Sequence, residues 1–497
     1  MSSLTNRGMS WQDIATLMVK HREDTFAAVQ PNIPELPKGL PLNVTGLPKK
    51  LIFAEVAEIT ESSPEFLLDQ LAAEKLTSTA VTKAFLQRAV LASKLTNCVT
   101  ELLPERAVAR AKYCDEYLAK HRKPIGRLHG LPISVKEHVA MKGLDLNAGF
   151  VSWVGHTANE DALILKLLWK AGCVFYARTT EPQALMHLET SNNIYGVTLN
   201  PYDTNLTSGG SSGGEGALLG VRGSCLGIGT DIGATMLGQE HINPVIGPLS
   251  TSLDGIKIFT KAIIEQQPWL YEPSLVRMLW KDASTETINR RESAGQRKLR
   301  VGILADDGVV RPHPPILRGI KTLVERLKLD PDIQVVEFPP WKHAEAWRII
   351  SSLYFADGGE VWNLTVQRDA YREAYARHWN SVNTSIPGPD SELENMVDVI
   401  LTPAGPGYCG YTAQWNLLDY PCLIFPTGLQ VGPEDTAEEG YQPRNDKDKY
   451  NYELYKPETF VGAPISLQLV GRRYEDEKVI EAMEIMLKAA GPLATNI

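Results

Sequence analysis

The sequence predicts an α/β fold with a large mixed β-sheet flanked by helices and a helical layer at the N-terminus. Short apolar runs, LPISVK (131–136) and CVFYAR (173–178), alternate with helical patterns such as ALILKLLWKAG (162–172). This alternation is typical of an α/β sheet. The pattern returns near the C-terminus, where we expect buried strands at residues 299–304, 397–403, 422–428 and 465–471.

The first 125 residues carry helical rather than strand patterns. Ser63 and Pro64 fit a helix cap followed by a first-turn proline. One helical face is then apolar, at Val81, Phe85, Leu86 and Ala89. We therefore expect a helical layer that covers a core, and we divide the chain into an N-terminal helical extension (1–61) and a main domain (62–497).

The C-terminal part ends in an amphipathic helix that stops near Gly491. Its apolar face comprises Val479, Ile480, Met483, Met486 and Leu487. Before it, the polar and turn-rich stretch 432–457 is predicted to be a long surface loop between strands.

Composition excludes several classes of protein. The 497 residues include 50 Lys and Arg against 59 Asp and Glu, a net charge of −9, with a pI near 5.7. This balance argues against an electrostatic nucleic-acid binder. No segment is long and apolar enough for a membrane span or has the form of a secretory signal. The six cysteines lack any CxxC pair, which favours reduced thiols and a cytoplasmic location.

The segment TSGGSSGGE (207–215) is the most unusual stretch of the chain. Ser212 and Glu215 fit a capping box, so Gly213 is expected to begin a helix. Glycines before the cap let the backbone approach a ligand closely, and a helix N-terminus favours negative charge. Standing alone, the segment is equally compatible with a plain Gly/Ser turn.

Other interpretations of this region are weaker. Gly210, Ser212 and Gly214 satisfy G-x-S-x-G, the nucleophile elbow of α/β-hydrolases, but that elbow requires a strand immediately before the serine and NPYDTNLTSGG is loop-like. The glycines of GSCLGIGTDIG (223–233) have the wrong spacing for a dinucleotide site. The histidines form no HExxH or similar ligand pair, so no metal site is expected.

Several motifs together resemble the amidase signature family, in particular its fungal acetamidase branch. They are HGLPISVKEHVAMKG, GGSSGGEGALLG and LGIGTDIG, followed by GYTAQWNLLDYP and GAPISLQLVGRRYEDE near the C-terminus. The similarity runs from about residue 62 to the end. It implies the amidase-signature fold and a catalytic centre formed by a lysine and two serines. The implied reaction is hydrolysis of a small-molecule carboxamide to a carboxylate and ammonia through an acyl-enzyme, without a cofactor.

The resemblance places the family's lysine on Lys136 and its bridging serine on Ser211. A serine hydroxyl is a poor nucleophile unless a base takes its proton, and a lysine serves as that base only when burial lowers its pKa. Lys136 ends the apolar run LPISV, where burial is expected. The resemblance also places Leu185 near the substrate.

The family's nucleophile is the serine that ends TDIGGS, and here the chain departs from the pattern. The segment reads Thr230-Asp231-Ile232-Gly233-Ala234-Thr235, so Thr235 is the hydroxyl at the nucleophile position. The implied oxyanion donors are the backbone N–H groups of Ile232, Gly233 and Ala234, and the implied substrate-binding residues are Leu185, Ser211, Ile232, Gly233, Ala234 and Thr235. Threonine can act as a nucleophile, although its methyl group crowds the attack.

The residues after Thr235, MLGQEHINPVIGPLS, resemble a part of the family that lies well beyond the nucleophile. The sequence therefore indicates that an intervening stretch with a core strand is missing, whose neighbours would lose ladder partners and buried contacts. A gene-model or splicing origin is favoured, because Lys136 and Ser211 are intact. The main alternative is a catalytically inactive amidase-fold protein; a third is an esterase that uses Ser212. The identity of the amide and the oligomeric state are not encoded in any motif.

Overall fold

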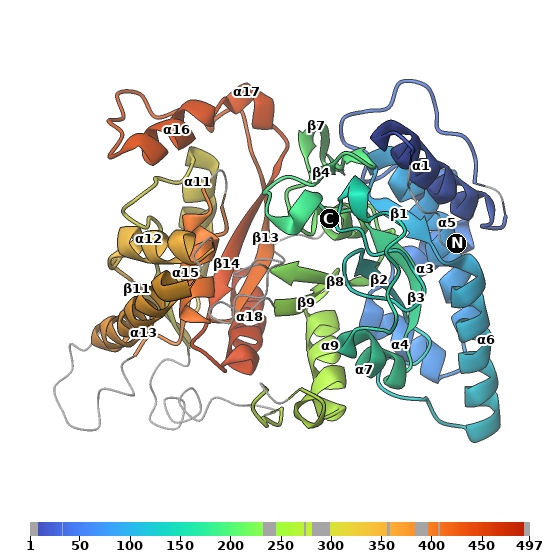
Figure 1. The fold of residues 1–497 in the computed structure, drawn as a ribbon. Helices are drawn as coiled ribbons and strands as arrows, with labels where there is room; N and C mark the ends of the chain where they lie inside the picture. The colour runs from blue at the N-terminus through green and yellow to red at the C-terminus, as the bar shows by residue number, and fades with distance from the viewer. Residues whose placement is uncertain are drawn as a thin grey trace. The chain divides into compact units, whose positions relative to one another are not determined.

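The chain is an α/β protein whose described strands form two five-stranded mixed sheets and two short two-stranded ribbons (Figure 1). The computed structural model describes residues 8–31, 33–231, 245–272, 275–280, 299–354, 358–382, 396–405 and 408–491. The compact units are Met1–Ile232 with Pro244–Trp280, and Gly233–Asn243 with Lys281–Ile497. Each unit holds one five-stranded sheet with helices packed on it, which confirms the predicted fold class. The boundary expected between residues 61 and 62 stays a prediction.

The first unit contains the expected N-terminal helices. Its helical segments are α1 (Trp11–Ala27), α2 (Pro48–Leu51), α3 (Ala54–Glu61), α4 (Pro64–Ala72), α5 (Ser78–Thr96), α6 (Pro104–His121), α7 (Leu163–Lys170), α8 (Gly213–Gly220) and α9 (Leu253–Glu265), with 3-10 turns η1 (Val151–Trp153), η2 (Gln183–Leu185) and η3 (Pro268–Leu270). Ser63 caps α4 by accepting a hydrogen bond from the N–H of Phe66, as its sequence predicts. Helix α5 buries the predicted apolar face and packs on α6 and β3.

The sheet of the first unit has the strand order β1-β3-β2-β8-β9. Its strands are β1 (Val99–Leu102), β2 (Pro132–Lys136), β3 (Val174–Thr179), β8 (Leu226–Asp231) and β9 (Val245–Ser250). Strands β3, β2 and β8 run parallel, whereas β1 and β9 are antiparallel to their neighbours. Two short ribbons, β4 (Ser191–Asn192) with β5 (Gly196–Val197) and β6 (Leu199–Asn200) with β7 (Asp203–Thr207), lie between β3 and α8 in sequence.

The expected loss of ladder partners beside the gap is wrong for β8. Strand β9 pairs with β8 along its whole length, from Leu226 opposite Ser250 to Asp231 opposite Val245. On β9 itself, Val245 is 50% exposed and Ile246 is 42% exposed. The expected loss of buried contacts stays a prediction. Strand β9 therefore satisfies the backbone of β8, while these two apolar side chains stay exposed.

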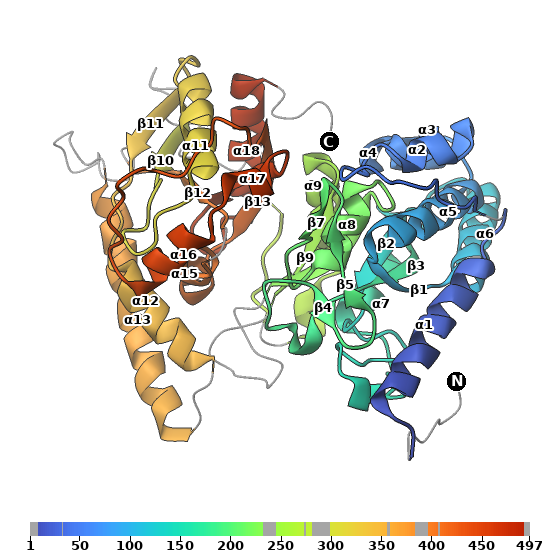
Figure 2. The ribbon, with the colours of Figure 1, turned by 90° about the horizontal axis from the view of Figure 1, so that it is seen from above.

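The second unit has a sheet of order β11-β10-β12-β14-β13, with helices on both faces (Figure 2). Its strands are β10 (Leu299–Ile303), β11 (Ile333–Glu337), β12 (Val399–Pro403), β13 (Cys422–Gln430) and β14 (Pro464–Val470). Its helices are α11 (Pro314–Leu327), α12 (His343–Leu353), α13 (Gly358–Ser381), α15 (Gly410–Leu418), α16 (Asp446–Leu454), α17 (Pro457–Phe460) and α18 (Asp476–Ala490). Helices α11 and α18 cover one face, and α12, α13 and α15 share a core with the other.

The predicted surface loop 432–457 is wrong in part, because it contains α16 and the start of α17. Asn445 begins α16 by accepting hydrogen bonds from the N–H groups of Lys447 and Asp448. The helix is polar, so its sequence carries little apolar periodicity. Across the described ranges, no helix is both long and apolar enough to cross a membrane.

Candidate active site

Lys136 lies at the carboxyl end of β2, between β3 and β8, where parallel strands place functional side chains at one edge of a sheet. All five residues of β2 are buried, and Lys136 is fully buried. A lysine is almost never fully buried unless its ammonium group is hydrogen-bonded. The sequence-based expectation of burial is thus met, and the partners of the ammonium decide what it can do.

Three hydroxyl groups surround the Lys136 ammonium. Nζ donates to Ser211 Oγ at 2.7 Å, to Thr230 Oγ1 at 2.9 Å and to Ser212 Oγ at 3.2 Å. All three donors of the ammonium are therefore used, and each acceptor is neutral. The structure brings together the two residues that the resemblance pairs, Lys136 and Ser211, across 75 positions of sequence.

Burial lowers the pKa of Lys136 to about 8, against the opposing charges of Glu181, Glu215 and Asp231, which raise it. With that pKa about one lysine in ten is neutral at pH 7, compared with about one in three thousand at the ordinary value. The environment thus makes Lys136 a usable base near neutral pH.

Ser211 and Ser212 have different roles in the turn that precedes α8. Ser212 Oγ accepts from the backbone N–H of Thr230 at 3.1 Å and donates to the Thr230 carbonyl at 3.2 Å. Helix α8 does begin at Gly213, but the predicted capping box is wrong, because this hydroxyl bonds to β8 instead of to the helix. Both hydroxyls accept from Lys136, but Ser212 Oγ is also held by the backbone of Thr230, which disfavours the esterase alternative.

Glycines of this region allow close packing within the chain. A Cβ at Gly214 would lie 2.5 Å from the backbone nitrogen of Thr180, and a Cβ at Gly227 would overlap a carboxylate oxygen of Glu215. The first free N–H groups of α8 are also used, since Gly213 donates to Thr190 Oγ1 and Gly214 to the Thr180 carbonyl. The glycines at these positions therefore serve the packing of α8 on the sheet.

Glu215 lies under the site and is fully buried. Its carboxyl oxygens accept from Ser134 Oγ at 2.6 Å and from Thr179 Oγ1 at 2.8 Å. Burial raises its pKa to about 7, although both hydrogen bonds and Lys136 lower it. Like Lys136, Glu215 is therefore a buried group that can gain or lose a proton near neutral pH.

Of the other predicted site residues, the structure describes only Leu185. Leu185 is buried in η2, and its N–H donates to the Pro182 carbonyl. Its position near a substrate stays a prediction. The remaining four predicted residues lie outside the residues that the structure describes: Ile232, Gly233, Ala234 and Thr235.

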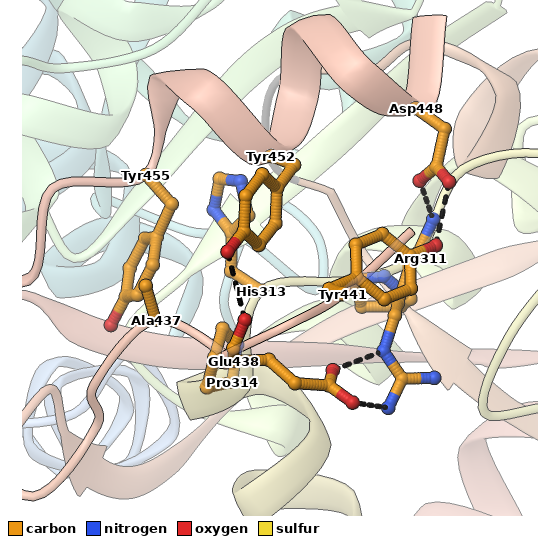
Figure 3. Close-up of a pocket in the computed structure, with 10 residues that line it drawn as sticks. Arg311, His313, Pro314, Ala437, Glu438, Tyr441, Asp448, Tyr452 and Tyr455 are labelled. Atoms are coloured by element: carbon orange, nitrogen blue, oxygen red, sulfur yellow. Dashed lines mark hydrogen bonds and ion pairs between the residues drawn. The ribbon is translucent and has the colours of Figure 1, made fainter. Parts of the chain in front are cut away.

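Two cavities lie away from Lys136. The larger, about 420 Å³, is in the first unit and its lining includes Met141, Trp169 and Tyr271. The smaller lies in the second unit, where α16 covers a space of about 20 Å³ (Figure 3). That space suits about one water molecule. Lys136 lines neither cavity, so neither is the place where its chemistry would occur.

Sequence inspection missed the other groups that contact Lys136 or act on it. Thr230 stands in the motif TDIG and Ser212 in the Gly/Ser turn, but only the fold shows that both hydroxyls reach the ammonium. Glu181 is 45 positions from Lys136 in sequence, and the parallel register of β2 with β3 brings it near.

A buried lysine of lowered pKa that is hydrogen-bonded to a serine is an arrangement found in hydrolases in which a lysine serves as the base. The comparisons agree with this class and make it specific. The model of the family described as Amidase matches residues 80–237 and 234–384, which together exceed half of the chain. The chain belongs to the amidase family and so to the amide hydrolases.

Individual relatives support the same assignment. An acetamidase of Emericella nidulans is 33% identical, covering 98% of this chain and 99% of the relative, and an acetamidase of Aspergillus oryzae is 33% identical, covering 97% and 99%. Among solved structures, a fatty acid amide hydrolase aligns with a TM-score of 0.85 at 32% identity, covering 98% of each chain. A bacterial aryl acylamidase shares the fold, with a TM-score of 0.64 at 15% identity.

The length of the alignments shows that the relatives have positions that this chain lacks. The alignment with the Emericella nidulans acetamidase spans 561 positions, although 98% of this chain is only about 487 residues. About 70 positions of the alignment therefore face no residue of this chain. The family model also matches in two parts, which meet at residues 234–237.

Proposed function

We propose that this protein hydrolyses a small carboxamide to a carboxylate and ammonia, with Lys136 as the base, Ser211 as the proton relay and Thr235 as the attacking hydroxyl. The observation that carries the proposal is the 2.7 Å hydrogen bond between Lys136 and Ser211 around a fully buried amine of lowered pKa. The amidase family supplies the reaction class, and the acetamidases among its members favour a short acyl group.

In the first half-reaction, neutral Lys136 accepts the proton of Ser211, and Ser211 takes that of the attacking hydroxyl. The hydroxyl oxygen bonds to the amide carbon, and the C–N bond breaks as the proton returns from Lys136 to the leaving nitrogen, which departs as ammonia. In the second half-reaction water attacks the ester carbon and gives its proton through Ser211 to Lys136. The C–O bond of the ester breaks, the proton returns from Lys136 through Ser211 to the oxygen of the attacking residue, and the product leaves as the acid, which ionises to the carboxylate. No cofactor enters either step.

The proposal also assigns the groups around the substrate. Backbone N–H groups of Ile232, Gly233 and Ala234 would stabilise the oxyanion, and donors of this kind are typically worth about 3 kcal/mol each. Leu185 would contact the acyl group.

Ammonia release from acetamide by the purified chain tests the proposal. Replacing Thr235 by Ser should raise the rate, because the change removes the methyl group that crowds the attack, and replacing it by Ala should abolish turnover. An active Thr235→Ala variant would contradict Thr235 as the nucleophile. Ser212→Ala serves as a control for the esterase alternative, which requires that variant to be inactive.

A second candidate, a catalytically inactive amidase-fold protein, is favoured by the missing alignment positions and by the two-part family match that meets at residues 234–237. Peptide mapping of the protein from its natural source separates the cases, because trypsin would release residues 223–257 as one peptide. A peptide of that mass, together with acetamide binding and no ammonia release, supports the inactive form. Longer peptides with a serine after DIGG would instead restore the family nucleophile.

A further inference from the structure

A pair of buried carboxyl groups lies beside Lys136, and the proposed mechanism does not use it. Glu137 follows Lys136 directly, and Glu181 stands two residues after β3 ends. Strands β2 and β3 are parallel, so both residues lie at the same edge of the sheet. Glu137 is 2% exposed and Glu181 is 1% exposed. Buried carboxyl groups require partners, which differ between the two.

The carboxyl group of Glu137 is held from two sides. Its oxygens accept backbone N–H groups, from Asn147 at 2.9 Å and from Ala148 at 3.0 Å. The guanidinium of Arg178 lies 3.4 Å from one of these oxygens. Burial nevertheless raises the pKa of Glu137 well above its ordinary value, with Glu181 adding to the rise.

Glu181 has one occupied and one unoccupied oxygen. Oε2 lies 2.6 Å from Nδ1 of His138, whose ring is partly exposed. Oε1 is buried and has no hydrogen-bond partner among the described residues. Burial raises the pKa of Glu181, but His138 and then Lys136 outweigh it, and the pKa ends below its ordinary value.

The interaction of the two carboxyl groups raises the pKa of Glu137 and lowers that of Glu181. Two buried carboxyl groups that interact in this way titrate as a pair, and Glu137 is the member that keeps a proton more readily. Glu181 then carries the negative charge of the pair.

That charge acts on Lys136. Three charged groups raise the pKa of Lys136: Glu181 from the segment after β3, Glu215 from α8 and Asp231 from β8. The effect of Glu181 is the largest of the three. Glu181 also contacts His138, and the neighbouring Glu137 contacts Arg178. The carboxylate thus opposes the burial that makes Lys136 a base.

We propose that Glu181 is a positioning residue whose carboxylate, held ionised by Glu137 and His138, governs how readily Lys136 gives up its proton. The inference deepens the proposed function, because it rests on Lys136 as the base. Removing the charge should make Lys136 easier to deprotonate. A nearby opposite charge typically moves a pKa by about one unit or more, so Glu181→Gln should lower the half-deprotonation pH of Lys136 by about one unit.

The test reads Lys136 directly and does not require turnover. Trace acetic anhydride acylates only the neutral amine: nitrogen bonds to the acyl carbon, acetate leaves and the amine proton passes to the buffer. Mass spectrometry of the Lys136 peptide across pH 5 to 11, divided by labelling of the exposed Lys75, gives the midpoint for Lys136. We expect Glu181→Gln to move this midpoint down by about one pH unit, and Glu181→Asp, which keeps the charge, to hold it near the wild-type value.

Glu101→Gln is the matched control. Glu101 is a buried carboxylate that pairs with Arg178 in the same network but is not among the charges that act on Lys136. A purely structural role for Glu181 predicts that Glu181→Gln and Glu101→Gln leave the labelling midpoint where it is, and that result would overturn the proposal. An inactive chain with the shifted midpoint would contradict the proposed function alone, so the two failures are distinguishable.

Discussion

Each unit of the molecule contains a charged cluster, and the two clusters differ in what surrounds the cations. In the second unit, Arg444 forms two 2.7 Å hydrogen bonds to the carboxylate of Asp306, and Arg311 pairs with Glu438. In the first unit, Lys136 is bonded to three neutral hydroxyl groups, and no carboxylate lies within ion-pair distance among the described residues.

The pKa shifts follow from these surroundings. The hydrogen bond with Asp306 raises the pKa of Arg444, so that cation keeps its proton at every accessible pH. Burial lowers the pKa of Lys136 to about 8, so its proton is exchangeable near neutral pH. Paired charges of the first kind fix loops in place, whereas a desolvated amine among hydroxyls can perform proton transfer.

The largest expected effect is the loss of activity when Lys136, the proposed base, is replaced. Replacing Lys136 by Met should lower kcat/KM for amide hydrolysis about a thousandfold in whichever form of the chain turns over, because general base catalysis is typically worth 10²–10⁴-fold. The fold should persist, since the change removes a buried charge. Lys83→Met, at an exposed site on α5, is the control. A Lys136→Met variant with a tenth of the wild-type rate would exclude Lys136 as the base.

The second effect concerns Glu215, whose pKa of about 7 is raised from 4.5 by burial. The folded state keeps this proton up to about pH 7, but the unfolded chain releases it near pH 4.5. This contribution to stability is therefore complete below pH 4.5 and is lost as the pH rises to 7, by about 3 kcal/mol. In urea unfolding across this range, Glu215→Gln should lack that part of the decline, whereas the exposed Glu160→Gln should retain it. An identical slope in both variants would contradict the raised pKa.

The third effect lies in the second unit, where Asp448 accepts hydrogen bonds from the backbone N–H groups of Arg311 and Arg444 and from the hydroxyl of Tyr441. Replacing it by Ala should cost about 2 kcal/mol in the free energy of unfolding, because three donors lose a charged acceptor. Burial raises the pKa of Asp448, but these hydrogen bonds outweigh it and the net pKa is lowered. Its stabilisation is therefore present above the unfolded pKa of about 4 and is lost as the pH falls through the lower folded value.

Urea unfolding at pH 7 and at pH 3 measures this effect, and the labelling midpoint of Lys136 provides the contrast with the first unit. The Asp448→Ala variant should leave that midpoint unchanged. A shift in the midpoint would mean that the two clusters are coupled, and the comparison between them would fail.

The sequence predicted those elements that have strong local patterns. Strands β2 and β3 are buried along their whole length and β14 along most of it. Their sequences are therefore apolar runs, and such runs predict strands. Strand β1, with the polar Thr100 and Glu101, was not expected, since its burial depends on Arg178 from β3 and on α1. Helix α16 was missed for the same reason, because it depends on its cap and on the partners of Asp448.

The site could be predicted to the same extent. Lys136 and Ser211 belong to motifs, and their contact is observed. The hydroxyl of Thr230 and the carboxylate of Glu181 reach the lysine only through strand register and a turn, which no local pattern encodes. The capping box failed because Ser212 and Glu215 both have tertiary partners, which compete with the local hydrogen bonds that the motif predicts.

The smallest effect sharpens the comparison by removing one hydroxyl from Lys136. Thr230→Val deletes an acceptor that stabilises the charged amine, so the midpoint for acylation of Lys136 should fall by about half a pH unit. The backbone of residue 230 should keep its two bonds to Ser212. Thr190→Val is the matched control, because the Thr190 hydroxyl accepts from Gly213 in the same turn without contacting the lysine. If the Thr230→Val midpoint stays fixed or rises, the Thr230 hydroxyl does not stabilise the charged amine. The pKa of Lys136 is then set by burial, which lowers it, and by the carboxylates, which raise it.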